Sequence, residues 1–157
     1  MQRRYTIFNL YIRGSNQSPQ SCHALNNLWK SREQMTPKAK ALFDDWAHNS
    51  EIEIMLQGGY HNELESIYDS LSKIKEVPSA KFNESVEALN GACTVVTFVA
   101  SDRIVAANTF VRKNRLTPAN ATEKLKEASP ESLGIDSPLT DDEILVVSIV
   151  AFLPLAN

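Results

Sequence analysis

Residues 92–100 read ACTVVTFVA, a run that contains no charged residue and is rich in β-branched and aromatic side chains. This composition predicts a buried strand. Ser101 and Asp102 follow directly and can cap a helix over residues 103–113. We therefore expect strands and helices to alternate in the rest of the chain as well.

The N-terminal part shows the same alternation. Residues 5–12 are aromatic and β-branched and end at Arg13-Gly14-Ser15, which predicts a strand and a turn. Ser18-Pro19 and Thr36-Pro37 predict the starts of two helices that run to about residues 31 and 48, because Ser and Thr suit the N-cap and Pro suits the first helical position. The stripe expected to be buried in the first helix consists of Cys22, Leu25, Leu28 and Trp29.

Two more strands and a helix are expected in the middle of the chain. Residues 51–56 predict a strand that ends in the turn Gly58-Gly59. Residues 62–75 carry apolar side chains at helical spacing, so this helix packs on the sheet, and a short strand is expected around 80–83.

The C-terminal part predicts helices rather than strands. Residues 114–139 contain three prolines, and we expect a long ordered loop with one short helix near 121–128. Residues 140–143 form a capping box, whereas 144–152 are β-branched enough for a buried strand. We favour a helix because the start signal agrees with the stop at Pro154.

These elements predict one α/β domain with a mainly parallel sheet. The chain has 157 residues, of which 43% are hydrophobic, enough for a single core. We expect a core over about residues 5–113 and a C-terminal helical extension over 114–157.

The sequence predicts a cytoplasmic protein without a membrane span or a signal peptide. No apolar run approaches the roughly 18 residues of a membrane helix, and the N-terminal apolar run is interrupted by Asn9 and lacks a small-residue cleavage site. Cys22 and Cys93 are expected to be reduced core residues.

Charge is segregated along the chain. Residues 1–40 hold seven Lys/Arg and one acid, a net charge of +6, and residues 41–100 carry a net of −7. Residues 101–126 return to +4, and 127–157 carry −6 without any basic residue. The N-terminal basic residues can form a nucleic-acid footprint if the fold gathers them on one face, whereas a solvated, dipolar surface is the simpler interpretation.

Sites in α/β sheets lie at the carboxyl ends of strands, which here indicates three places: residues 14–23, the turn 58–61 and the segment after Ala100. The turn and helix start at 14–19 are suited to a phosphate, but neither a Gly-x-Gly-x-x-Gly motif nor a Walker lysine is present. The three histidines show no metal spacing, so we expect neither a metal nor a cofactor.

The first of these places resembles type 2 peptidyl-tRNA hydrolases. Gln20-Ser21-Cys22-His23-Ala24 keeps the family's Gln and His-Ala at the start of the first helix, and residues 89–96 are similar to its Thr-Val-bearing last strand. Closer still are bacteriophage proteins of the same fold, which share patterns like Asp45-Trp46-Ala47 and a tail like 139–156. The resemblance implies three layers, with helices on both faces of a mixed, mostly parallel four-stranded sheet, and it implies a homodimer in the host cytoplasm.

The resemblance also implies a site. Gln20 would donate to the developing oxyanion, and His23 would act as a base or an orienting group. Asn16 stands where the family has a lysine and cannot replace its charge. The residues expected to bind the substrate are Arg13, Ser15, Ser18, Gly58 and Gly59.

Each of these residues also has a structural interpretation. His23 next to an apolar stripe can be a packed core residue, and Gln20 can serve a neighbouring loop. Gly58-Gly59 can simply permit a tight turn, and His61 is most simply a surface residue.

Two functions follow, together with a simpler third. The first is a peptidyl-tRNA hydrolase-like esterase that cleaves the bond between a blocked aminoacyl group and tRNA. The second is a catalytically lapsed phage protein that uses a cleft by Ser15 to Gln20, Gly58 and Gly59 to bind a nucleotide, an RNA end or a host protein. The third is a protein-interaction module that uses the acidic segment 127–157.

Overall fold

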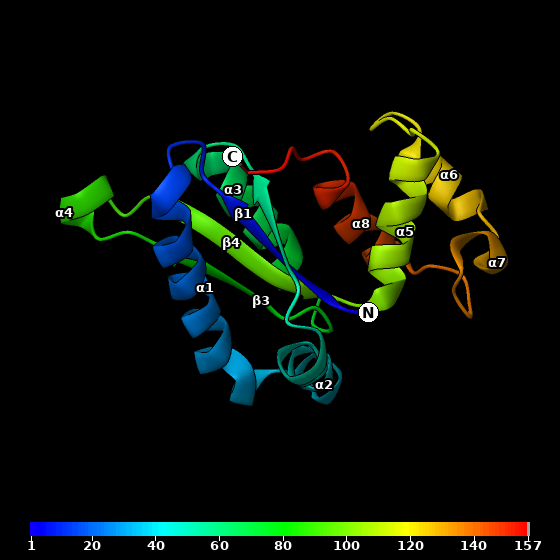
Figure 1. Ribbon diagram of the computed structural model, residues 1–157, viewed down its shortest axis with the longest axis horizontal. Coiled ribbons are helices and arrows are strands. Elements are labelled where there is room, and N and C mark those ends of the chain that lie inside the picture. Colours follow the sequence, from blue (N-terminus) through cyan, green and yellow to red (C-terminus); the bar gives the residue numbers. More distant parts are fainter. Residues whose placement is uncertain (157) are drawn as a thin grey trace.

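The computed structural model describes residues 1–156, which contain a four-stranded sheet of order β2-β1-β4-β3 (Figure 1). The strands are β1 (Arg3–Phe8), β2 (Glu53–Gln57), β3 (Ser79–Asn83) and β4 (Cys93–Ala100). β1 pairs in parallel with β2, whereas β4 runs antiparallel to both β1 and β3.

The α/β class and the mixed sheet are confirmed, but the expectation of a mostly parallel sheet is wrong. Within residues 1–156, one of the three strand pairs is parallel. The connection between β3 and β4 holds only the short helix α4 (Val86–Leu89). Parallel strands need a crossover of about a dozen residues or more, so this shorter connection returns β4 beside β3 in the opposite direction.

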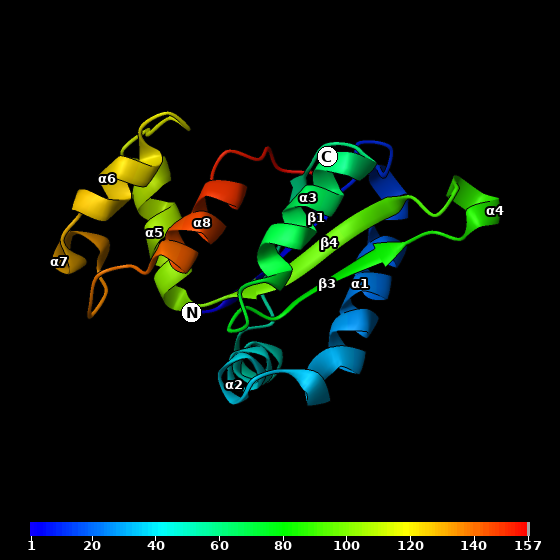
Figure 2. The same cartoon turned by 180° about the vertical axis from the view of Figure 1, so that it is seen from behind.

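Helices cover both faces of the sheet. α1 (Gln17–Ser31) and α2 (Pro37–Asp45) lie on one face and α3 (His61–Ser72) lies on the other, as the two opposite views show (Figures 1 and 2). Short helical turns η1 (Gly14–Asn16), η2 (Arg32–Gln34) and η3 (Trp46–Ser50) flank the first two helices. Side chains alternate along the strands: Tyr5 and Phe98 are in the cluster shared with α3, whereas Phe8 and Val95 meet Ala24 of α1.

The buried face of α1 differs from the expected stripe. The helix buries Gln17, Gln20, Ser21, Ala24 and Leu28. Cys22 and Trp29 are exposed, so the expectation that Cys22 lies in the core is wrong, whereas Cys93 is buried as expected. The physical reason is that the sheet presents buried polar side chains to the first half of α1: Thr94 bonds Gln20, and Arg4 bonds Ser21.

The C-terminal part forms a group of helices at one end of the sheet (Figure 1). These are α5 (Asp102–Lys113), α6 (Ala121–Glu127), α7 (Pro130–Leu133) and α8 (Asp141–Val150). The preference for a helix at the end of the chain is confirmed, and Thr140 and Glu143 form the expected capping box. Residues 114–139 hold two short helices rather than one, because Leu125 and Leu133 are buried against α5 and α8.

The chain then returns to the sheet. Leu155 forms an antiparallel bridge with Leu56, Pro154 accepts a hydrogen bond from the Gln57 N–H, and Ala156 donates one to the Met55 carbonyl. These contacts cover the outer edge of β2. Among the described helices, none has the length and apolar character needed to cross a membrane.

Candidate functional site

Gln20, the first predicted catalytic residue, joins α1 to β4 and to the connection that follows β3. Its Oε1 accepts a hydrogen bond from Thr94 Oγ1 at 2.8 Å, and its Nε2 donates to Glu84 Oε1 at 2.5 Å. The side chain is buried. Both ends of the amide are therefore engaged within the protein, as in the structural interpretation of this residue.

His23 lies one turn further along α1 and does not join this network. The residue is exposed, and its ring stacks on Phe82 of β3 with 4.5 Å between the ring centroids. The structure thus places Gln20 and His23 against the same strand pair, with Gln20 buried and His23 at the surface. His23 is therefore not a core residue. Within residues 1–156, it forms no hydrogen bond with Thr94 or Glu84, the two partners of Gln20.

The remaining predicted residues near the start of α1 are at the surface. Ser15, Asn16 and Ser18 are exposed, and in the described part of the chain the Asn16 side chain makes no capping hydrogen bond to α1. Arg13 is also exposed, and its Nε donates to the Leu10 carbonyl at 3.0 Å. This guanidinium can reach a ligand in solvent, but it is fixed to the loop that precedes the helix.

Gly58 and Gly59 permit close packing at the turn between β2 and α3. A Cβ at Gly58 would lie 2.8 Å from both Ile7 Cγ2 and Leu64 Cδ1, and one at Gly59 would lie 2.7 Å from the Glu63 side chain. The Gly58 N–H also donates to the Phe8 carbonyl at 2.8 Å. Contact with the protein itself is thus sufficient to explain both glycines.

A cleft of about 300 Å³ opens beside this turn, at the carboxyl end of β1. Its walls come from the segment after β1, the start of α3, the β3–β4 connection and the first residues of β4. The lining residues are Asn9, Tyr11, Ile12, Tyr60, His61, Leu89, Ala92 and Thr94. The position agrees with the rule that sites of α/β sheets lie at strand ends.

Two tyrosines form the rim of the cleft. Tyr11 is 76% exposed and Tyr60 is 49% exposed, and their ring centroids are 5.2 Å apart with a tilt of 47°. Leu89 of α4 is also exposed beside them. A surface with so much aromatic area around a hollow is typical of a binding site.

The polar groups in the cleft are held rigidly. Asn9 is buried, donates through Nδ2 to the Cys93 carbonyl at 3.1 Å and accepts the Tyr11 N–H through Oδ1. The Cys93 N–H donates to Nδ1 of His61 at 3.0 Å. A neutral His61 therefore carries its proton on Nε2, which makes that nitrogen a donor. Thr94 links the cleft to Gln20.

The sequence predicts a site at the turn that carries Tyr60 and His61, and His61 is exposed, in agreement with its interpretation as a surface residue. Asn9 appeared only as an interruption in an apolar run, and Thr94 was part of a strand. The available signal was the pairing of polar and aromatic residues directly after a predicted strand, at Asn9 and Tyr11.

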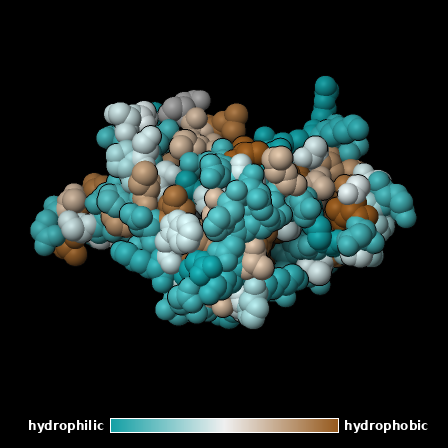
Figure 3. All heavy atoms as spheres, turned by 60° about the horizontal axis from the view of Figure 1, so that its bottom comes forward, coloured by the Kyte–Doolittle hydropathy of each residue, from teal (hydrophilic) through white to brown (hydrophobic). Residues whose placement is uncertain are grey.

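The N-terminal basic residues do not form a single basic surface. Arg4 pairs with Glu53 at 2.8 Å, Arg32 with Asp44 at 2.5 Å, Lys40 with Glu33 at 2.8 Å, and Lys38 with Glu76 at 2.5 Å. The face that carries α2 is largely hydrophilic, with scattered apolar groups (Figure 3). Four of the seven N-terminal basic residues are thus neutralised by ion pairs, which leaves a weaker field for a phosphate backbone. Within residues 1–156, Arg3, Arg13 and Lys30 form no ion pair.

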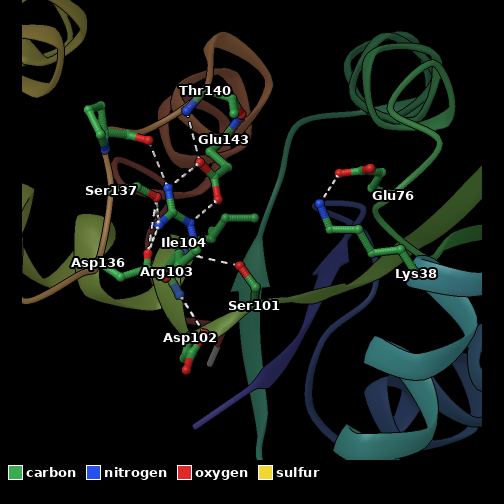
Figure 4. A network of polar contacts seen from close by, with 11 residues as sticks. Lys38, Glu76, Ser101, Asp102, Arg103, Ile104, Asp136, Ser137, Thr140 and Glu143 are labelled. Atoms are coloured by element: carbon green, nitrogen blue, oxygen red, sulfur yellow. Dashed lines mark hydrogen bonds and ion pairs between the residues drawn. The ribbon is translucent and has the colours of Figure 1, made fainter. Parts of the chain in front are cut away.

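A larger cavity of about 480 Å³ lies where α2, the α3–β3 connection and the starts of α5 and α8 meet. Three of its charged side chains have structural partners (Figure 4): Glu143 binds Arg103 at 2.7 Å, and Lys38 binds Glu76. The Ser101 and Thr140 hydroxyls accept hydrogen bonds from N–H groups of their own helices. We therefore regard the tyrosine-rimmed cleft as the candidate functional site.

Over residues 1–156, no group of three or more His, Cys, Asp or Glu side chains is arranged to hold a metal ion. Comparison with protein-family models gives no match, and comparison with curated proteins gives no similar sequence. The chemistry of the site must therefore be argued from its residues.

Proposed function

We propose that the protein binds a nucleobase, presented by a nucleotide or by an RNA end, in the tyrosine-rimmed cleft, and that it does not hydrolyse its ligand. The observation that carries this proposal is the combination of two exposed tyrosine rings with a histidine of fixed tautomer around one hollow. Stacking of a base on an aromatic ring contributes about 1–3 kcal/mol and tolerates any base.

The polar groups supply a modest selectivity. His61 Nε2–H can donate to a ring nitrogen or a carbonyl oxygen of the base. Arg13 follows Ile12 of the cleft in sequence, but it lines a separate hollow with Gln57, Pro154 and Leu155. Its exposed guanidinium can meet a phosphate there, outside the cleft. With one arginine at this place, binding should weaken only mildly with salt.

Catalysis has less support in the geometry. An ester hydrolase needs a group that activates water and a donor for the oxyanion. Gln20 is bound at both ends, His23 stacks on Phe82, and Asn16 is neutral. The binding function, which was the second expectation from the sequence, is thus the better supported one.

The esterase is the second candidate, and one contact favours it. Thr94 lines the cleft, and its hydroxyl donates to Gln20. The Thr94 hydroxyl would therefore lie between a substrate in the cleft and the predicted catalytic amide of Gln20. The resemblance of residues 20–24 to type 2 peptidyl-tRNA hydrolases points the same way.

Binding is tested by calorimetric titration with the four nucleoside monophosphates and with a short RNA that ends in CCA. Tyr11→Ala should weaken binding about 5- to 100-fold, as expected from the loss of one stacking contact. Tyr11→Phe is the matched control, since it keeps the ring and should bind like the unmodified protein. Equal affinities for all three proteins, or no binding of any of these ligands, would contradict the proposal.

Hydrolysis is tested on N-acetyl-aminoacyl-tRNA with the unmodified protein, Gln20→Ala and His23→Ala. We expect no release of the blocked amino acid by any of them. Turnover by the unmodified protein that disappears in Gln20→Ala or in His23→Ala would establish the esterase instead.

A further inference from the structure

A third cavity lies on the α1 face of the sheet and shares no lining residue with the tyrosine-rimmed cleft. It has a volume of about 290 Å³ and lies between α1, the turn η3 and the start of β2. The lining residues are Arg4, Leu25, Trp29, Trp46, Ala47, Glu51 and Glu53. Both tryptophans of the protein are therefore in this one cavity.

Glu53 brings a carboxylate with one free oxygen to the cavity. Its Oε1 accepts hydrogen bonds from Thr6 Oγ1 at 2.6 Å and from Ser21 Oγ at 2.7 Å, and it forms an ion pair with Arg4 at 2.8 Å. Across residues 1–156 no donor bonds its Oε2. A carboxylate accepts at both oxygens, so the second one has room for a donor from a ligand.

The net charge of the cavity is negative. The guanidinium of Arg4 is neutralised by Glu53, and Glu51 adds an exposed carboxylate with no ion pair within the described chain. An anionic ligand would meet two carboxylates here, whereas a cation would restore neutrality.

The two indoles of the cavity differ in exposure. Trp46 is buried; its Nε1–H donates to the Ile52 carbonyl, and Arg4 lies over its ring at 5.4 Å. Trp29 meets Phe43 edge-on and is still 45% exposed. An exposed indole on this scale is unusual for a helix that packs on a sheet, and indole is the best aromatic partner for a cation.

We propose that this cavity binds the guanidinium group of an arginine side chain from a partner peptide. The guanidinium stacks on the Trp29 indole and donates to the free oxygen of Glu53 and to the Glu51 carboxylate. A planar, weakly hydrated guanidinium suits this combination better than a compact ammonium, since it can stack and donate at the same time. The bound arginine would lie beside Arg4, which already stacks on Trp46.

Intrinsic fluorescence tests this proposal directly, because both reporters are in the cavity. The probe is N-acetyl-arginine amide, titrated at constant ionic strength, and the neutral control is N-acetyl-citrulline amide, which has nearly the same shape. We expect the arginine probe to change the emission in a saturable way, the citrulline probe to leave it unchanged, and N-acetyl-lysine amide to bind more weakly. An equal response to arginine and citrulline would overturn the charge assignment, and an equal response to lysine would overturn the guanidinium assignment.

Variants locate the response. Glu51→Gln, at an exposed position, should weaken binding of the arginine probe by about threefold. Trp29→Ala keeps Trp46 as a fluorophore, and the emission of Trp46 should show no saturable change with the arginine probe because binding is lost. Glu53→Gln should weaken it further, with far-UV circular dichroism and a thermal melt to show that the protein is folded. Unchanged affinity in Glu51→Gln and Trp29→Ala would overturn the proposal, whatever the stability of Glu53→Gln.

Discussion

Cys22 and Cys93 differ in exposure, so their thiols should react at very different rates. Cys22 is exposed on α1. Burial, with a contribution from Glu65, raises the pKa of the Cys93 thiol to about 11, which leaves roughly one thiol in a thousand ionised at pH 8. We expect a chromogenic disulfide reagent to titrate one thiol per chain in the native protein and two in denaturant.

Cys22→Ser is the control for this experiment. It should show no fast thiol in the native state and one in denaturant. Two fast thiols in the native protein would contradict the burial of Cys93, and none would contradict the exposure of Cys22.

Single residues of the candidate site could be predicted only in part. None of the predicted catalytic or substrate-binding residues lines the tyrosine-rimmed cleft, and Gln20 reaches it only through Thr94. Its two partners, Thr94 and Glu84, are more than sixty residues away along the chain. His61 owes its fixed tautomer to a backbone N–H of β4. Periodicity and local motifs carry no information on such contacts, which exist only once the sheet has formed.

Among the helices, α5 and α8 are joined by a network of charges around Arg103. Its Nε bonds Glu143 at 2.7 Å, and the same guanidinium bonds Asp136 at 2.5 Å and the Pro138 carbonyl at 2.9 Å (Figure 4). Burial acts to raise the pKa of Glu143, but the hydrogen bonds from Arg103 and from the Thr140 N–H outweigh it and hold that pKa below its usual value of 4.5.

This network should make stability depend on pH. Because the pKa of Glu143 is lower in the folded state than in the unfolded state, its contribution is complete above about pH 4.5 and is lost as the pH falls through the folded value. Arg103→Gln should lower the free energy of unfolding by about 1–3 kcal/mol at pH 7, since the partly buried Glu143 carboxylate loses the guanidinium and keeps only the Thr140 N–H as a donor. The difference from the unmodified protein should shrink at pH 3.

Urea unfolding at both pH values measures this effect. Lys124→Gln, which removes an exposed pair with Glu127, is the control and should change stability by less than about 1 kcal/mol at either pH. A deficit of Arg103→Gln that is equally large at pH 7 and pH 3 would show that the ion pair with Glu143 is not its cause.

Helices were the most predictable elements when a local cap was present. Thr36, Ser101 and Thr140 all accept the expected N–H, and the box at Thr140 and Glu143 correctly favoured a helix over a β-branched strand. The buried face of α1 was not predictable in this way, because it packs on polar groups of the sheet and its apolar Trp29 is partly in solvent. Hydrophobic periodicity identifies the buried face of a helix only where the surface on which the helix packs is apolar.

At the scale of the whole molecule, the relative direction of neighbouring strands depends on the length of the connection between them. The crossover from β1 to β2 contains two helices and gives a parallel pair, whereas the β3–β4 connection is short and gives an antiparallel one. These lengths can be read from the sequence. The alternation of strands and helices predicts a mostly parallel sheet, whereas the short connection at residues 84–92 favours an antiparallel pair. The arrangement of α5–α8 beside the sheet had no local signal.

The C-terminal tail completes the molecule by covering the outer edge of β2, and its removal from that edge should be measurable. Ala156→Pro deletes the N–H that donates to the Met55 carbonyl and should cost about 1 kcal/mol of folding free energy. The Gln57 N–H, which donates to Pro154, should then exchange faster with deuterium, since the tail holds it less firmly. Ala156→Ser keeps the donor, and its Gln57 N–H should exchange as in the unmodified protein.

An uncovered strand edge can pair with a second chain, so Ala156→Pro should also show concentration-dependent self-association by light scattering. If Gln57 exchanges equally in both variants, the edge of β2 is not protected by the tail.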